Sequence, residues 1–226
     1  MATLILLSLV FTAVGAEGLK SDLALAEEYY FARKFATAAQ YLERQLAKDP
    51  HNSRAAALMG DILLFNSRYE EAIRYYERAL EFSDEPAVEH YRLGQALLAL
   101  KRGQEAKGHF QKAYEIDPSL HRCLFQIGYI SLLYERNKEN TIFYWRRFLA
   151  QDPQDPQADK IEEAIRVLED PNFELPQEAT LASTLDFLRY GSTYSEPQQV
   201  LPKDKEAPYL EEKEVFEKKD LLPEDE

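Results

Sequence analysis

The side chains best suited to chemistry are four histidines, at positions 51, 90, 109 and 121, and a single cysteine, Cys123. Only His121 and Cys123 are close in sequence, and together they would supply two of the four ligands that a zinc site needs. The chain has no glycine-rich phosphate loop, no Gly-x-Ser-x-Gly turn, no His-Glu-x-x-His helix and no paired-cysteine motif. We therefore predict no metal site, no cofactor and no enzymatic activity.

The charge balance narrows the choice of partner. The 226 residues carry 40 acidic and 27 basic side chains, a formal net charge of −13. An acidic chain repels phosphate backbones and anionic lipid, so we expect no nucleic-acid partner. The carboxylates alternate with Lys and Arg along the predicted helices, which is typical of solvated helix faces.

One stretch of the chain repeats itself at a spacing of 34 residues. The matched pairs are Gly60 and Gly94, Ala72 and Ala106, Tyr76 and Phe110, and Ala79 and Ala113. A fixed period of this length indicates stacked supersecondary units. The stretch resembles the tetratricopeptide repeat family, whose helix-turn-helix unit has a small residue in its first helix, Ala-x-x-x-aromatic in its second helix and a closing proline. The resemblance implies an all-α fold, a right-handed α-solenoid of about four units.

The same period divides the chain into units at about 19–52, 53–86, 87–120 and 121–154, the last with one inserted residue. An amphipathic segment at 157–169 is expected to cap the array, because a terminal unit would otherwise expose its apolar face. The glycines should let the two helices of a hairpin approach closely, with Ala72 and Ala106 meeting Gly60 and Gly94 across the contact.

The two ends of the chain differ from the array. Residues 1–16 are uncharged and apolar over a length that suits a signal peptide cleaved after Ala16, with an uncleaved membrane anchor or a plain first helix as alternatives. A cleaved signal predicts export, to the periplasm or cell envelope. Residues 170–226 are rich in proline and acidic side chains, and we expect a largely disordered tail. Within it, residues 181–190 have leucines at helical spacing, typical of a recognition or self-docking segment.

In this family the inner wall of the solenoid is lined by the first helix of each unit. The resemblance therefore implies a set of partner-binding residues here: Leu23, Glu27, Tyr30, Arg54, Asp61, Leu64, Tyr91, Arg92, Gln95, Arg122, Phe125 and Tyr129. Chaperone-binding members have Lys and Asn where this chain has Leu23 and Glu27, so binding of a chaperone tail is not expected.

Two features of this wall suggest how it binds. Tyr91, Phe125 and Tyr129 should cluster as an exposed aromatic group, unless the capping helix or residues 181–190 cover them. Arg54, Arg92 and Arg122 could orient acidic groups of a partner.

We weigh two functions. The first is a non-catalytic scaffold or adaptor that holds a peptide or protein segment against this wall. The alternative is a structural subunit of a membrane-associated assembly, with its groove filled by its own tail. The oligomeric state is left open.

Overall fold

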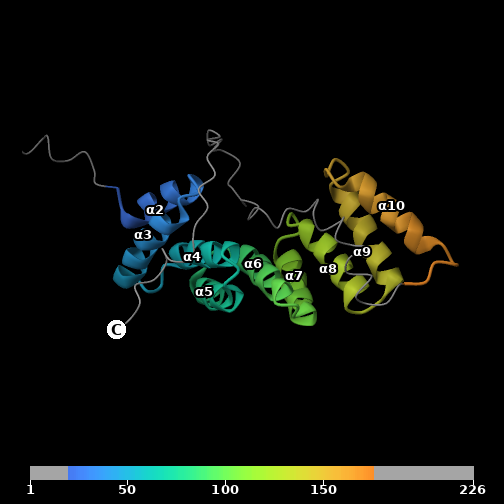
Figure 1. Ribbon diagram of the computed structural model, residues 1–226, viewed down its shortest axis with the longest axis horizontal. Coiled ribbons are helices and arrows are strands. Elements are labelled where there is room, and N and C mark those ends of the chain that lie inside the picture. The colour runs from blue at the N-terminus through green and yellow to red at the C-terminus, as the bar shows by residue number, and fades with distance from the viewer. Residues whose placement is uncertain (1–19, 176–226) are drawn as a thin grey trace, which may run out of the picture. The chain divides into compact units, whose positions relative to one another are not determined.

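The computed structural model describes residues 20–175, and within this range every regular element is an α-helix, which confirms the all-α prediction (Figure 1). Residues 20–50 form one compact unit and residues 51–175 another, and each is described by itself. The first unit holds α2 (Asp22–Phe31) and α3 (Phe35–Lys48). The second holds the remaining helices: α4 (Ser53–Phe65), α5 (Tyr69–Phe82), α6 (Pro86–Ala99), α7 (Gly103–Ile116), α8 (Arg122–Leu133), α9 (Lys138–Gln151) and α10 (Ala158–Glu169).

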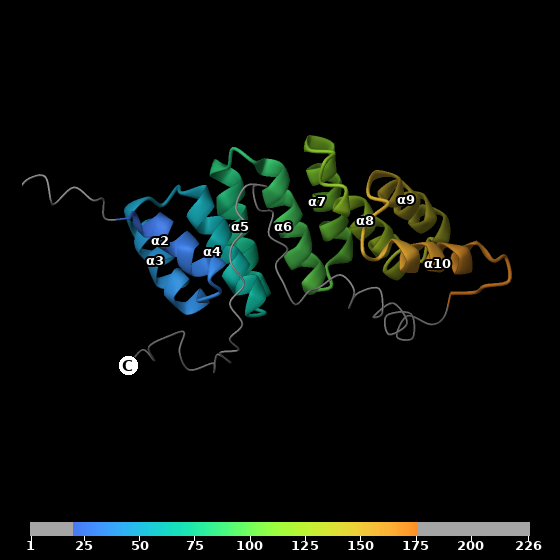
Figure 2. The same ribbon diagram turned by 90° about the horizontal axis from the view of Figure 1, so that it is seen from above.

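The helices pair as successive hairpins. Helix α2 packs on α3, and in the second unit α4 packs on α5, α6 on α7 and α8 on α9 (Figure 2). Neighbouring hairpins meet through α5 with α6 and α7 with α8, while α10 packs on α9. Helix α10 lies where the capping helix was expected. The hairpins thus follow one another in chain order, as the period of the sequence predicts.

Each hairpin turns at a residue in the left-handed backbone region. Arg33, Ser67, Lys101 and Arg136 have φ angles of 58°, 60°, 61° and 53°. The first three are 34 residues apart, whereas Arg136 comes one residue later than that spacing. The closing hydrogen bonds show where the extra residue lies. Arg102 N donates to Leu97 O, five residues back, but Asn137 N donates to Ser131 O, six residues back. The insertion in the fourth unit is therefore absorbed in the turn after α8.

In each hairpin of the second unit, the two helices meet at a glycine. A β-carbon on Gly60 would lie 2.5 Å from the ring of Tyr76, and one on Gly94 would lie 2.8 Å from the ring of Phe110. Gly128 has the same relation, at 2.5 Å, to Trp145. The prediction of a close approach at the glycines is confirmed. The nearest side-chain atoms at each glycine belong to an aromatic ring, which the sequence analysis did not predict, and Ala72 and Ala106 are fully buried in the same helices. A flat ring needs bare backbone beneath it, and only glycine provides that surface.

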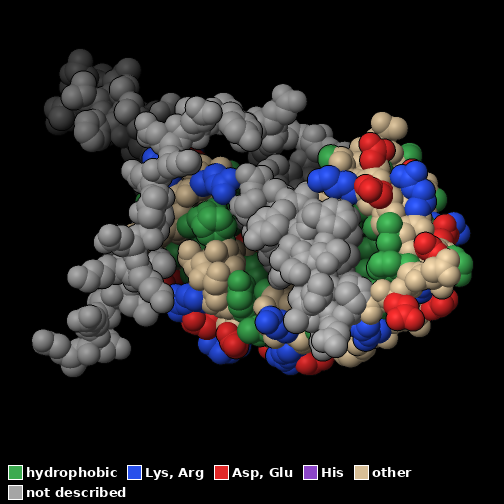
Figure 3. Space-filling model, turned by 45° about the vertical axis from the view of Figure 1, so that its right-hand side comes forward, with side chains coloured by type: hydrophobic (Ala, Val, Ile, Leu, Met, Phe, Trp, Pro, Cys, Tyr) green, Lys and Arg blue, Asp and Glu red, His purple; other side chains and the backbone are tan. Residues whose placement is uncertain are grey.

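The predicted leader at 1–16, the segment at 181–190 and most of the acidic tail lie outside the described residues. No helix among residues 20–175 has both the length and the apolar character needed to cross a bilayer. Charged side chains of both signs are interspersed with hydrophobic ones on the described surface (Figure 3).

Candidate protein-binding surface

The wall residues expected on α2 form a small local cluster in the first unit. Tyr30 is buried and packs against the rings of Phe31 and Phe35, with centroids 5.5 and 5.7 Å away. Leu23 and Glu27 are half-buried on the same helix. Tyr30 is therefore a packing residue of its own hairpin.

In the second unit, the wall residues of α4 and α6 meet in a buried charged network. Tyr76 Oη donates a hydrogen bond of 2.8 Å to Asp61 Oδ1, and Arg92 Nε donates one of 3.2 Å to the same oxygen. Arg92 also donates from Nη1 to Glu89 Oε1 at 2.9 Å. The three charged side chains are each at most 12% exposed. The network therefore joins α4, α5 and α6 by charge-assisted bonds.

Glu89 is the least satisfied member of this network. Its Oε2 atom is buried and has no hydrogen-bond partner within the described part of the chain. Burial raises the pKa of Glu89, and the charges of Arg92 and Arg54 only partly oppose that rise. Removal of a carboxylate from water disfavours its ionised form, which accounts for the direction.

The aromatic residues of α8 pack into the fourth hairpin. Phe125 stacks on Trp145 with centroids 5.9 Å apart and lies 5.7 Å from Phe148. Tyr129 stacks on Phe125 at 6.5 Å. Phe125 and Tyr129 are only 4% and 7% exposed. The expectation of an exposed aromatic group is therefore wrong, because the indole ring that covers Gly128 also covers Phe125.

Tyr91, the third aromatic residue of the expected group, packs within its own hairpin. Its ring meets Phe110 edge-on at 5.5 Å. Burial raises the pKa of Tyr91 to about 12, with smaller effects from Cys123 and Arg122 of α8. The neutral phenol is therefore the form present at any physiological pH.

Two of the three arginines expected to orient a partner are paired internally. Arg92 lies between Asp61 and Glu89, as described above. Arg122 donates from Nη2 to Asp155 Oδ2 at 2.6 Å, and the side chain of Asp155 is 1% exposed. The other oxygen of Asp155 accepts from the backbone N–H of Gln157, next to the start of α10. These two arginines thus hold hairpins together, which corrects the expectation that they are available to acidic groups of a partner.

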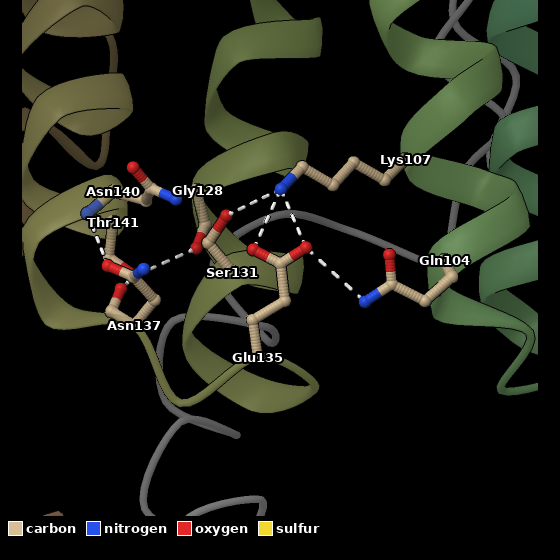
Figure 4. Close-up of polar contacts among 8 residues, drawn as sticks. All are labelled: Gln104, Lys107, Gly128, Ser131, Glu135, Asn137, Asn140 and Thr141. Carbon is tan, nitrogen blue, oxygen red and sulfur yellow. Dashed lines mark hydrogen bonds and ion pairs between the residues drawn. The ribbon is translucent and has the colours of Figure 1, made fainter.

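A second polar cluster fastens α8 to its neighbours (Figure 4). Lys107 Nζ of α7 lies 2.7 Å from both oxygens of Glu135, which also accepts from Gln104. Burial alone would raise the pKa of Glu135, but the bonds from Lys107 and Gln104 lower it overall. On the other side, Thr141 Oγ1 donates to Gly128 O at 3.2 Å. Both contacts fix α8 between α7 and α9.

The histidines and the cysteine form no joint site. His121 Nε2 lies 3.2 Å from Asp152 Oδ2, while Cys123 is fully buried. Burial raises the pKa of the Cys123 thiol to about 12. His90 and His109 face each other, with their Nδ1 atoms 3.0 Å apart. Within residues 20–175, no group of three or more His, Cys, Asp or Glu side chains is placed to hold a metal ion.

What remains accessible on the wall is a partly polar rim. Arg54, Leu64 and Gln95 are half-buried, whereas the wall positions between them along α4, α6 and α8 are mostly buried. Sequence reasoning missed Glu89 and Asp155, whose carboxylates complete the two arginine pairs. Glu89 lies three residues before Arg92 on α6, a spacing at which opposite charges on a helix can pair, so a local signal for this pair was present. Asp155 follows α9 and lies 33 residues from Arg122, so the sequence gives no local sign of that pair.

Two profiles of the tetratricopeptide repeat match the sequence, at residues 32–90 and 87–120. Residues 32–120 belong to the tetratricopeptide repeat family. The matched ranges include the second and third hairpins, in which the 34-residue period is strict. No curated protein matches the sequence.

Solved structures of similar fold span most of the chain. PilF of Pseudomonas aeruginosa superimposes with a TM-score of 0.59 at 22% identity, covering 75% of this chain and 76% of PilF. YrrB, described as a tetratricopeptide repeat protein with an unusual peptide-binding site, gives a TM-score of 0.55 at 18% identity and covers 77% of this chain and 97% of YrrB. MamA from AMB-1 gives 0.52 at 23% identity, with 59% and 72% covered. At these identities the likeness shows the fold.

Proposed function

We propose that this protein is a non-catalytic scaffold or adaptor that holds a peptide or protein segment against α4, α6 and α8. One observation carries the proposal: every residue of α8 from Cys123 to Leu132 is buried. The described helices that pack extensively on α8 are α7 and α9. A helix that packs extensively on two neighbours can offer its remaining apolar face to another polypeptide.

The chemistry of the wall suggests what kind of segment it accepts. Arg92 and Arg122 are neutralised by internal carboxylates, so little charge is left for a strongly charged partner. The buried positions are mostly apolar or aromatic, and Arg54, Leu64 and Gln95 are half-buried at the rim. We therefore expect a segment with apolar side chains at helical or extended spacing, with affinity from burial of those side chains.

Photocrosslinking in the native cell tests this function. A benzoylphenylalanine residue is placed at Gln95 or Leu64 on the rim and, as matched controls, at Arg74 or Lys112, which are exposed on α5 and α7. We expect the same protein adducts from both rim positions and none of them from the controls. The substitution Tyr129→Ala should weaken those adducts. Identical adducts from rim and control positions would contradict binding at the wall.

We also propose that the protein is exported to the cell envelope. The support is the uncharged apolar run at 1–16 with small residues before Glu17. N-terminal sequencing of the protein from fractionated cells tests it. A chain beginning at Glu17 in the envelope fraction is expected, a membrane-bound chain beginning at Met1 indicates an anchor, and a chain with Met1 in the cytosol contradicts export.

A second candidate function, as a structural subunit of a membrane-associated assembly, draws on a different surface. Ile116, Phe143 and Val167 are 51%, 53% and 44% exposed on α7, α9 and α10. An assembly that used these helices would bury them. Substitution of Phe143 by Ser should then shift the native size of the assembly, while an unchanged size would exclude this surface.

A further inference from the structure

The chain that leaves α10 returns to the turn between α8 and α9. Arg136 Nη2 donates to Leu175 O at 2.9 Å, and Lys138 Nζ donates to Phe173 O at 2.8 Å. The Lys138 ammonium also lies 5.8 Å from the centre of the Phe173 ring, within the range of a cation–π contact. These contacts join residues 35 and 39 positions apart in sequence. They fix the start of the C-terminal tail beside the end of α8.

The wall residues of α8 lie within reach of the contacts at Arg136 and Lys138. Tyr129 lies one to two helical turns before the turn at Arg136, about 10 Å along the helix. Leu181 is six positions after Leu175, and an extended chain over six residue steps spans up to about 20 Å. A segment that starts at Leu181 can therefore lie against α8 without strain.

The segment at 181–190 matches the covered wall in character. Its sequence, LASTLDFLRY, has one acidic and one basic residue, in a tail that is otherwise strongly acidic. Leu181, Leu185 and Leu188 recur at the spacing that lines one face of a helix. On α8, Phe125, Tyr129 and Leu132 are 4%, 7% and 1% exposed at the positions expected to face a ligand. The packing of Phe125 in its own hairpin accounts for its burial. The described helices that pack extensively on α8 are α7 and α9.

We infer that residues 181–190 of this same chain cover the wall formed by α6 and α8 and occupy the site at which a partner binds. The inference rests on the proposed function for the identity of the site. The tether at Arg136 and Lys138 supplies the segment at an effective concentration in the millimolar range, so a partner must displace an intramolecular competitor.

The first test uses the full-length chain with benzoylphenylalanine at Phe187. We expect crosslinks within one chain, mapped by mass spectrometry to α6 or α8, at a yield that is independent of protein concentration. The control carries the additional substitutions Leu181→Asp, Leu185→Asp and Leu188→Asp, which keep the tail length and the tether and should abolish those crosslinks. Crosslinks elsewhere, no crosslinks, or crosslinks only between two chains would overturn the inference.

The second test adds a fluorescein-labelled peptide with the sequence of residues 181–190. The triple-aspartate variant should bind it at least about tenfold more tightly than the wild type, because the wild-type site is already filled. Equal binding to both proteins, or binding to neither, would overturn the inference. Partner adducts at Gln95 test the proposed function separately, since these can fail while the self-binding result holds.

Discussion

Gly128 lies so close to Trp145 that a β-carbon on the glycine would stand 2.5 Å from Cδ1 of the indole. The same indole donates through Nε1 to Phe125 O at 3.1 Å, one helical turn before the glycine. Ring and backbone are thus held together by both packing and a hydrogen bond. Gly60 with Tyr76 and Gly94 with Phe110 show the same packing of an aromatic ring on a glycine, here called the glycine joint. One type of contact therefore sets the separation of the helices in three hairpins.

This joint predicts opposite effects of one substitution at two sites. Gly94→Ala should lower the free energy of unfolding by about 1–3 kcal/mol, because the new methyl group must displace the Phe110 ring. Gly108→Ala on α7 meets no atom within 4 Å. It should raise the free energy by about 0.5–1 kcal/mol through helix propensity. Urea unfolding followed by circular dichroism measures both, and a gain at Gly94 would refute the role of the ring.

The charged network predicts a large effect of Arg92. Arg92→Met leaves Asp61 and Glu89 buried without their cation, and we expect a loss of about 3–5 kcal/mol in the free energy of unfolding. Arg102→Met is the matched control, since Arg102 pairs with Glu105 at the exposed surface of α7, and it should leave the urea midpoint unchanged. Comparable midpoints for the two variants would show that the network contributes little.

The His90–His109 pair predicts that stability falls as the pH is lowered. Burial is the largest cause that lowers the pKa of each ring, and the charge of Lys112 adds to it, while Glu105 acts in the opposite direction on His109. The unfolded chain then binds more protons than the folded chain below about pH 6.5, so the free energy of unfolding decreases as pH falls through that range.

Urea midpoints between pH 7.5 and 5.5 measure this effect. His109→Gln should flatten the pH dependence, because it removes one of the two titrating rings and their shared 3.0 Å contact. A wild-type midpoint that rises toward pH 5.5 would contradict the assignment.

The positive φ angles in the hairpin turns predict that a glycine there would stabilise the folded protein. Lys101 has a φ of 61°, a region that costs a side chain energy and costs glycine little. We expect Lys101→Gly to raise the free energy of unfolding by about 0.5–1 kcal/mol. Lys112→Gly, in the interior of α7, should instead lower it by about 1 kcal/mol. Thermal unfolding of the two variants gives the comparison, and a loss at both positions would argue against relief of strain at Lys101.

The period of the sequence was sufficient to predict the hairpins and the glycine joints. Gly60 and Gly94 stand in register because the same packing contact recurs in each unit, and the extra residue of the fourth unit was visible as a shift of one position. The ring over each glycine was harder to predict, because the alanine and the aromatic residue of the second helix recur with the same 34-residue period. The period alone does not show which of them lies nearer the glycine.

The wall was harder to predict than the hairpins. Arg92 finds Asp61 in the preceding hairpin, and Arg122 finds Asp155 after the following helix, so neither pairing is local in sequence. The burial of Phe125 depends on its contact with Trp145. Trp145 lies on the second helix of the hairpin, which the family pattern of wall positions does not include. Which residues of the wall contact a partner stays a prediction.

Cys123 gives α8 a natural reporter of its own motion. The chain has one thiol, it is fully buried, and burial raises its pKa to about 12. A thiol in this state reacts with alkylating reagents only during the moments when α8 separates from its neighbours. The labelling rate of the unmodified protein therefore measures how often this helix detaches, and any ligand that clamps α8 should slow that rate without an engineered probe.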